Sequence, residues 1–447
     1  GYALASDLQD AVDEGRYRPL APAGQRGDIS DLLYDPQQNS VSENTFFDAK
    51  TSGELANWGA GPVMMAVGVQ ALRELYRDTP DARTLNGEVL NIATTAGGGA
   101  RNSASLFAEF SEQPLEGLEL VEALRFDYFE GFGSTVNPKL GVRYRPINEI
   151  MFRSSVGTGF KAPQMQRLYS AQTAGRSGFV DQVHCNKMGG DACNFQQNAV
   201  VIGGNRDLKE ERSFSFNVGT VVQPNKRHNF GVDFWYYDLS DLVEETDYGA
   251  ITRAEAAGVD IGQYGALAER DPVTGELIGR GLYAPYLNIS STETQGIDFD
   301  YDGRFPTSIG DFRLQFRHSH MIYYKTEPFP GVGVSDRIGL NGRPQWRNNT
   351  TLFYVPHRNH EISILARTIA SNAKRIPSRG RYPTYTEYDL RYNWNVDALD
   401  GRLTFGIKNL LGTLPPFDDS NPNDADINFR LYDERGRSAY LGYRQVF

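Results

Sequence analysis

Apolar and polar residues alternate strictly along the segment from Gly296 to Tyr324. The apolar positions are Ile297, Phe299, Tyr301, Phe312, Leu314 and Phe316, and the polar positions between them are Asp298, Asp300, Asp302, Arg313, Gln315 and Arg317. A turn-forming stretch at 306–310 separates the two halves. Strict period 2 predicts two antiparallel strands, each with one apolar and one polar face.

The charges on the polar faces favour a membrane barrel over a soluble sheet. A soluble sheet would show the same alternation, with its apolar face packed on a core. Here the aspartates of the first strand oppose the arginines of the second, close enough for pairing across the hairpin. Such a face suits a water-filled interior, and the large aromatic residues of the other face suit contact with lipid. An inside-out transmembrane β-barrel is therefore the leading hypothesis.

The same alternation recurs along the chain and predicts about fifteen strands, mostly in pairs. Residues 1–43 are polar and irregular, with a short helix expected near 7–14, and we expect them to form a loop ahead of a barrel domain at 44–447. The expected strands are 44–56 and 62–76, 101–113 and 117–129, 137–146 and 149–161, 210–222 and 227–240, 285–304 and 310–325, 345–355 and 359–373, 383–395 and 402–410, and 438–447 alone.

The connections between these strands fall into two classes. Those within pairs are short, whereas those between pairs mostly run long, and the longest are 162–209, 241–285, 326–344 and 411–437. This alternation puts the tight turns at one rim and the long loops at the other, as in outer-membrane barrels with short periplasmic turns. A β-sandwich or propeller has no reason to sort its loops in this way. The fold class we predict is an all-β, antiparallel, up-and-down transmembrane barrel.

Composition agrees with spanning by strands. The chain of 447 residues has 23% charged residues, a mean hydropathy of -0.48 and 46 glycines, and it contains no run of about 18 or more apolar residues that a membrane helix needs. Its 24 tyrosines and 25 phenylalanines suit the aromatic girdles of a barrel. The net charge of -11 argues against nucleic acid as a partner. There is no initiator Met and no signal peptide, so we expect a mature or truncated product.

Several segments resemble TonB-dependent outer-membrane receptors. They are RSSVGTGFKAP at 153–163, LKEERSFSFNVG at 208–219, NLLGTLPP at 409–416, NPKLGVRYRP at 137–146 and QGIDFDYDGRF at 295–305, and they follow the order of that family. The last strand would end on the periplasmic side with Phe447 as an assembly signal, although Gln445 departs from the apolar residue expected there.

The resemblance implies an N-terminal plug domain, a TonB box and a barrel of about 22 strands. With about fifteen strands and no plug, the chain resembles the C-terminal part of such a barrel. The family's partners would be outer-membrane lipid of a Gram-negative bacterium, the TonB energy-coupling protein acting through the missing plug, and a small-molecule ligand such as a metal chelate.

Cys185 and Cys193 are the two cysteines of the chain, and both lie in the longest expected loop. An oxidising periplasm would join them across a short ring containing glycine. A metal site is the alternative, but His184 is the one nearby histidine, so we expect the disulfide.

Two further groups carry residue types that bind metals. His318 and His320 lie two apart on one strand face, and we expect them to continue an outward face near the long-loop rim rather than form half a metal site. Acidic residues crowd the last long loop, at Asp418, Asp419, Asp424 and Asp426. Their spacing matches no EF-hand, and we expect them to be solvated rather than to bind calcium.

Charged residues on the polar strand faces are the candidate ligand-facing and plug-facing groups. They are Arg143, Arg145, Arg153, Asp298, Asp300, Asp302, Arg313, Arg317 and Arg391, and we expect them to face the lumen. Most should satisfy one another across neighbouring strands. No nucleophile, base and orienting group can be assembled from the sequence, so we expect neither an enzyme nor a cofactor.

The function that we expect is active import of a scarce, bulky ligand across the outer membrane. Ferric siderophores are the first candidate, because they are the cargo that the family resemblance implies, and cobalamin, oligosaccharides and peptides are the alternatives. A passive porin and a surface-exposed binding or adhesion protein are the alternatives from other classes.

Overall fold

One large antiparallel sheet makes up most of the computed structural model, which describes residues 2–22, 24–90, 93–244, 247–340, 342–374, 377–419 and 426–445. Its strands are β3 (Gln38–Trp58), β4 (Gly61–Pro80), β6 (Gly97–Leu115), β7 (Leu118–Phe129), β8 (Gly133–Ile147), β9 (Ile150–Lys161), β12 (Glu211–Asn225), β13 (His228–Glu244), β16 (Leu287–Thr307), β17 (Gly310–Glu327), β19 (Trp346–His357), β20 (His360–Ile369), β23 (Tyr385–Val396), β24 (Gly401–Lys408) and β27 (Ser438–Gln445). Short β18 (Ser335–Asp336) pairs with β17 and brings the sheet to 16 strands.

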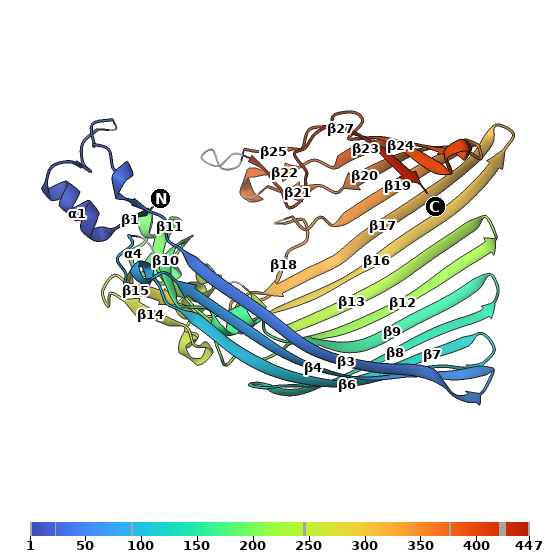
Figure 1. Cartoon of the computed structure of the whole chain (residues 1–447), viewed down its shortest axis with the longest axis horizontal. Helices are drawn as coiled ribbons and strands as arrows, with labels where there is room; N and C mark the ends of the chain where they lie inside the picture. Colours follow the sequence, from blue (N-terminus) through green and yellow to red (C-terminus); the bar gives the residue numbers. More distant parts are fainter. Residues whose placement is uncertain are drawn as a thin grey trace.

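The long strands follow one another in nearest-neighbour order from β3 to β27. Figure 1 shows them as a curved wall with β3 and β27 at its two edges, and the strand pairs of the described residues include none between these two. The tight turns lie at one end of the wall and the long loops at the other (Figure 1). The up-and-down antiparallel topology that the alternation predicts is confirmed, and so is the count of about fifteen wall strands.

The first wall strand is longer than the sequence pattern indicated. β3 begins at Gln38 rather than near residue 44, because residues 38–43 continue the ladder opposite residues 75–80 of β4. Ahead of it lie the expected helix α1 (Ala5–Asp13), the 3-10 turn η1 (Ser30–Leu32), and the strand pair β1 (Tyr2–Ala3) and β2 (Leu33–Tyr34). In the described part of the chain, no helix is long and apolar enough to cross a bilayer.

The registers assign every wall residue to one of two faces. We call the face that carries Asp298 and Arg313 the polar face, and the face that carries Phe299 and Phe312 the apolar face. Bulky side chains of the apolar face stay open to the surroundings, for example Leu124 at 52% and Val232 at 45% exposure. The sheet therefore buries neither face in a conventional core, and no second sheet covers the apolar one in the described residues.

The buried core lies instead among the long loops, beyond the end of the wall. The long-loop elements are α2 (Ala82–Leu85), β5 (Ala93–Thr94), α3 (Met165–Tyr169), β10 (Thr173–Phe179), α4 (Gln182–Met188), η2 (Gly190–Cys193), β11 (Gln196–Ile202), α5 (Tyr248–Ala256), η3 (Ile261–Tyr264), β14 (Leu267–Arg270), β15 (Leu277–Tyr283), β21 (Asn372–Ala373), η4 (Pro377–Arg379), β22 (Arg381–Tyr382), β25 (Phe417–Asp418) and β26 (Asp426–Ile427). The 3-10 turn η5 (Asp397–Leu399) lies instead in the tight turn between β23 and β24. The strands β14, β15, β11, β10 and β5 form a separate five-stranded sheet in that order.

Candidate functional site

A row of charged residues crosses the polar face of the wall from strand to strand. Arg143 of β8 lies opposite Arg153 of β9, and Arg153 connects through Gly219 of β12 to Asp233 of β13. Asp233 in turn lies opposite Asp298 of β16. The registers and the two-residue period put all nine candidates on this face: Arg143, Arg145, Arg153, Asp298, Asp300, Asp302, Arg313, Arg317 and Arg391.

Three of these arginines bind carboxylates of adjacent strands or of the strand beyond. Arg153 donates from Nε to Asp233 Oδ1 at 2.8 Å, and Arg143 donates to Glu119 at 2.9 Å. Arg313 donates from Nε to Asp302 Oδ1 at 3.0 Å. Asp233 and Glu119 were not among the sequence candidates. The alternation of β13 and β7 could have identified both, because each occupies a polar-face position.

The middle of the wall carries an open cavity of about 820 Å³ on its polar face, and this cavity is lined by charges of both signs. Its lining residues include Arg153, Asp233, Asp298, Asp300, Arg317, Arg347, Asn217 and Asn349. Within the described chain, Asp298, Asp300, Arg317 and Arg347 make no ion pair, so their charges are available to a solute or to another protein surface. Arg347 is a further residue that the sequence candidates omitted.

A second hollow of about 520 Å³ lies beside the cavity and is mainly cationic. Its charged lining residues are Lys139, Arg143, Arg145, Arg153 and Glu119, and it shares Arg153 and Asn217 with the larger cavity. Because β8 and β9 meet in a tight turn between Ile147 and Ile150, this hollow lies toward the tight-turn end of the wall. The two cavities together offer fixed charges that can bind charged groups by ion pairs and hydrogen bonds.

The long loops fold into a compact body that we call the loop unit, residues 93–94, 162–209 and 247–287 with Phe329. Its five-stranded sheet and α5 enclose a buried core whose members are Phe179, Val200, Ala250, Ile251, Ala254, Ile261, Ala266, Leu277, Leu282, Ala284, Leu287 and Phe329. A second cluster of Met165, Leu168, Leu208 and Val243 packs near the wall strands. The sequence pattern predicted only loops in these segments, so the loop unit is a finding of the structure.

A largely buried arginine connects three parts of the loop unit. Arg270 of β14 donates to Asp181 at 2.7 Å, to Glu255 of α5 at 2.7 Å and to the Gly275 carbonyl at 2.6 Å. Its side chain is 12% exposed. Burial by itself would lower the pKa of the guanidinium, but the hydrogen bonds to Glu255 and Asp181 outweigh burial and raise it. The neighbouring turn is held by Asp271, whose pKa is lowered by hydrogen bonds from the Thr274 backbone and hydroxyl.

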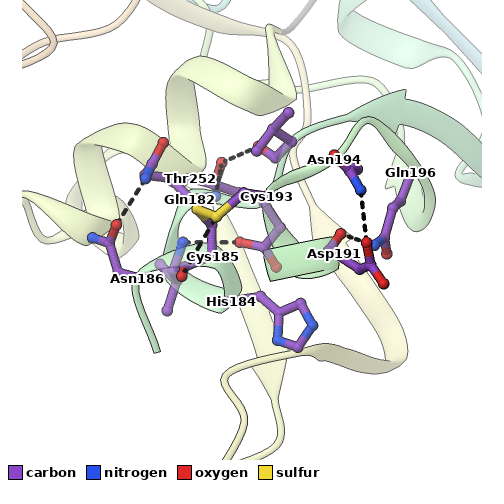
Figure 2. The surroundings of a disulfide bond; sticks show 12 residues. Gln182, His184, Cys185, Asn186, Asp191, Cys193, Asn194, Gln196 and Thr252 are labelled. Atoms are coloured by element: carbon purple, nitrogen blue, oxygen red, sulfur yellow. Dashed lines mark hydrogen bonds between the residues drawn. A yellow bond between two sulfur atoms is a disulfide. The ribbon is translucent and has the colours of Figure 1, made fainter. Parts of the chain in front are cut away.

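The disulfide expected between Cys185 and Cys193 is present and joins α4 to η2, with Cα atoms 4.5 Å apart. Figure 2 shows it beside Gln182 and Thr252, so the staple lies against α5. His184 points its Nδ1 to the Thr274 carbonyl at 2.9 Å. With both thiols oxidised, the metal alternative at this place has no thiolate ligand.

Removing the disulfide should increase local opening of α4 without lowering the stability of the wall. We expect the double variant C185S/C193S to show faster hydrogen exchange at residues 182–193, because the closed ring is small and lies far from the wall ladder. Exchange across β12 and β13 should be unchanged. Labelling of free thiols in the native, unreduced protein would contradict the premise.

Among the other residues considered as metal ligands, the histidines of β17 and two acidic residues of the last long loop contact other side chains instead. His318 stacks with Phe316, His320 and Trp346 on the apolar face. Asp418 accepts a hydrogen bond from the Tyr382 hydroxyl, and Asp419 pairs with Lys374. The described residues contain no group of three or more His, Cys, Asp or Glu arranged to hold a metal ion. Asp424 and the expected assembly residue Phe447 lie outside the described residues.

Comparison with known proteins gives one family and many similar folds. The family of TonB dependent receptor-like β-barrels matches residues 3–410, which is more than half of the chain. A mutant ferric enterobactin receptor PfeA of Pseudomonas aeruginosa, in complex with enterobactin, is similar with a TM-score of 0.64 and 12% identity over 90% of this chain and 54% of that chain.

Two other solved structures are similar to this chain in fold. The siderophore receptor PirA from Acinetobacter baumannii has a TM-score of 0.60 and 15% identity, over 96% of this chain and 57% of that chain. The structure of an FpvAI–pyocin S2 complex has a TM-score of 0.56 and 10% identity, over 91% and 50%. This chain thus spans about half the length of the structures it resembles. No curated protein matches it.

Proposed function

Since this chain belongs to the family of TonB-dependent receptor β-barrels, we propose that it is the C-terminal part of the wall of an outer-membrane importer for a ferric siderophore. Members of the family are outer-membrane barrels of Gram-negative bacteria. In this proposal the apolar face contacts lipid, the polar face lines the lumen, and the part of the barrel wall that this chain supplies starts with β3 at Gln38.

The proposal is supported by the arrangement of binding surfaces along the wall. The loop unit lies at the long-loop end of the strands, opposite the tight turns (Figure 1). The charged cavity at Asp298, Asp300 and Arg317 lies farther along the polar face. A ligand captured at the loops would therefore meet fixed charges of both signs on its way to the periplasm. The single observation that carries the proposal is the position of the folded loop unit at one end of the wall and of a cavity with unpaired charges farther along its polar face.

We propose that energy coupling acts through a plug domain, which the described residues do not contain. The fold neighbours are about twice as long as the residues matched here. We infer that the full-length protein carries the plug and contacts a TonB-type energiser through it. The siderophore receptors among the fold neighbours support an iron chelate as the ligand, with cobalamin, an oligosaccharide or a peptide as alternatives.

The test is uptake by the full-length protein in a strain that lacks its own siderophore receptors. We expect transport of labelled ferric siderophores that is lost when the inner-membrane energiser is deleted. Uptake that continues without the energiser would identify a passive pore. Surface binding without any uptake would identify an adhesion or binding protein, and either result would overturn the proposal.

Charge removal inside the cavity should slow uptake without unfolding the wall. R317Q and R347Q should each lower uptake by up to about fivefold, because a partly exposed charged contact contributes up to about 1 kcal/mol. Neither arginine makes an ion pair in the described chain, so the wall should keep its stability. R227Q, in the exposed β12–β13 turn, is the matched control. Equal uptake by all three variants would show that the charges of this cavity do not contribute to transport of the ligand.

A further inference from the structure

Glu122 places a carboxylate on the apolar face of the wall, away from the loop end of the strands. Glu122 of β7 lies opposite Phe110 of β6 on one side and Leu140 of β8 on the other. The same row continues through Val156 of β9 to Phe216 of β12. Glu122 therefore belongs to the face that carries the bulky apolar side chains, not to the face of the ion pairs.

This carboxylate has no partner and few charged neighbours. Glu122 makes no hydrogen bond or ion pair in the described part of the chain. Over β7, β8, β9, β12 and β13, the registers place two other charged side chains on the apolar face, Arg212 and Asp238, both at the loop end. Glu112 of β6 shares the face but lies beside the β6–β7 turn. A lone charge on a lipid-facing surface is costly, which points to a counter-charge from outside the chain.

Glu122 borders an apolar hollow of about 620 Å³ on the same face. Its apolar lining includes Ala108, Phe110, Leu124, Leu140, Val156 and Phe214. The small side chain of Ala108 leaves a depression between the larger ones. Lys139 also lines the hollow, but its register assigns it to the polar face and it makes no ion pair with Glu122.

The depth of Glu122 matches the boundary between headgroups and acyl chains. It lies four residues after Leu118, the first residue of β7, which is about 13 Å along a strand. With strands tilted by about 40°, this distance corresponds to about 10 Å of depth from the tight turn. A headgroup layer is about 5–7 Å thick. The carboxylate is then a few ångströms below that layer, within reach of a headgroup charge.

We propose that this hollow binds one aminophospholipid, with an acyl chain against Ala108 and Leu140 and the primary ammonium of the headgroup paired with Glu122. The inference rests on the proposed membrane span of the wall. An anionic headgroup would meet a carboxylate of like charge, and a quaternary ammonium has no N–H to donate. A primary ammonium supplies both the opposite charge and the hydrogen bonds that Glu122 lacks.

Native mass spectrometry of the full-length protein, after exchange into mixed micelles, tests the proposal. The micelles contain equal amounts of phosphatidylethanolamine, phosphatidylglycerol and phosphatidylcholine. We expect one retained phosphatidylethanolamine on the wild type, and E122Q should reduce its excess over phosphatidylcholine by about fivefold, as for a partly exposed charge pair. A108F, which fills the hollow, should reduce retention of all three lipids. E109Q is the matched control, because Glu109 lies on the polar face of the adjacent strand.

Each alternative gives a distinct result. Equal retention of the three lipids by the wild type, or unchanged selectivity in E122Q, would overturn the proposal. A change of oligomeric state in E122Q without a change in lipid retention would assign the hollow to a second copy and also overturn it. Competition by free phosphoethanolamine would show that the headgroup alone suffices, contrary to the role given to the acyl chain. Flotation with vesicles measures membrane insertion separately, so a failed membrane span is distinguishable from a failed lipid site.

Discussion

Replacing Arg270 by Ala should unfold the loop unit while leaving the wall intact. Arg270 lies between Asp181 and Glu255, whose side chains are 4% and 24% exposed. Removing the cation leaves two poorly hydrated carboxylates without a counter-charge, a change that costs about 3–5 kcal/mol for a buried pair. The same change removes a hydrogen bond to the Gly275 carbonyl. We expect hydrogen exchange of β10 and β11 to rise sharply and proteases to cleave residues 173–202.

A control variant shows whether the effect comes from the ion pairs of Arg270 or from the loss of any positive charge in the loop unit. Arg253 of α5 is 44% exposed and reaches Asp247 only at 3.6 Å, so R253A should change exchange little. R270K should lie between the two, because a lysine keeps the charge but cannot satisfy both carboxylates in the same geometry. Unchanged exchange in R270A would show that the apolar core alone holds the loop unit together.

The wall was predictable because its signal is local. In a strand that separates lipid from water, successive residues face opposite sides, and their polarity indicates which side. The hairpin at 296–324 therefore already places Phe299 and Asp300 on opposite faces. Short and long connections then gave the topology, and the strand order from β3 to β27 confirms it. Ends were less predictable: β3 continues to Gln38 because β4 supplies a partner, which no property of residues 38–43 indicates by itself.

The loop unit was not predictable for the opposite reason. Its strands are short, from two residues in β5 to seven in β11, and its core joins Phe179, Ile251 and Phe329 from three different connections. Periodicity within a window of residues cannot detect a core that forms only when distant loops meet. The disulfide was predicted because two cysteines eight apart in a loop need no distant information.

The sequence predicted which residues lie on the polar face of the wall, but not which of them form ion pairs with one another. Alternation identified Arg153 and Asp298 as residues of one face, yet which aspartate pairs with Arg153 depends on register. The register across β12 places Asp233 next to Arg153, while Asp298 stays unpaired. A one-residue shift in any strand would have moved its charges to the other face, so only the structure shows which charges remain available.

Expressed alone, this chain should give no energy-dependent uptake, whereas the full-length gene product should give it. The described strand pairs leave one edge of β3 and one edge of β27 without a partner. Hydrocarbon cannot satisfy the backbone groups of such edges. Fifteen wall strands also fall short of the about 22 that surround a plugged lumen in large outer-membrane transporters.

Both forms would be expressed in a strain without its own receptors, and uptake of a labelled ferric siderophore measured with and without the energiser. Heat-modifiable migration of each form is the control, because it reports whether a closed barrel has formed independently of transport. We expect it for the full-length product and not for this chain. Energiser-dependent uptake by the chain alone would show that these fifteen strands close and couple without further residues, and the proposed division between wall and plug would then be wrong.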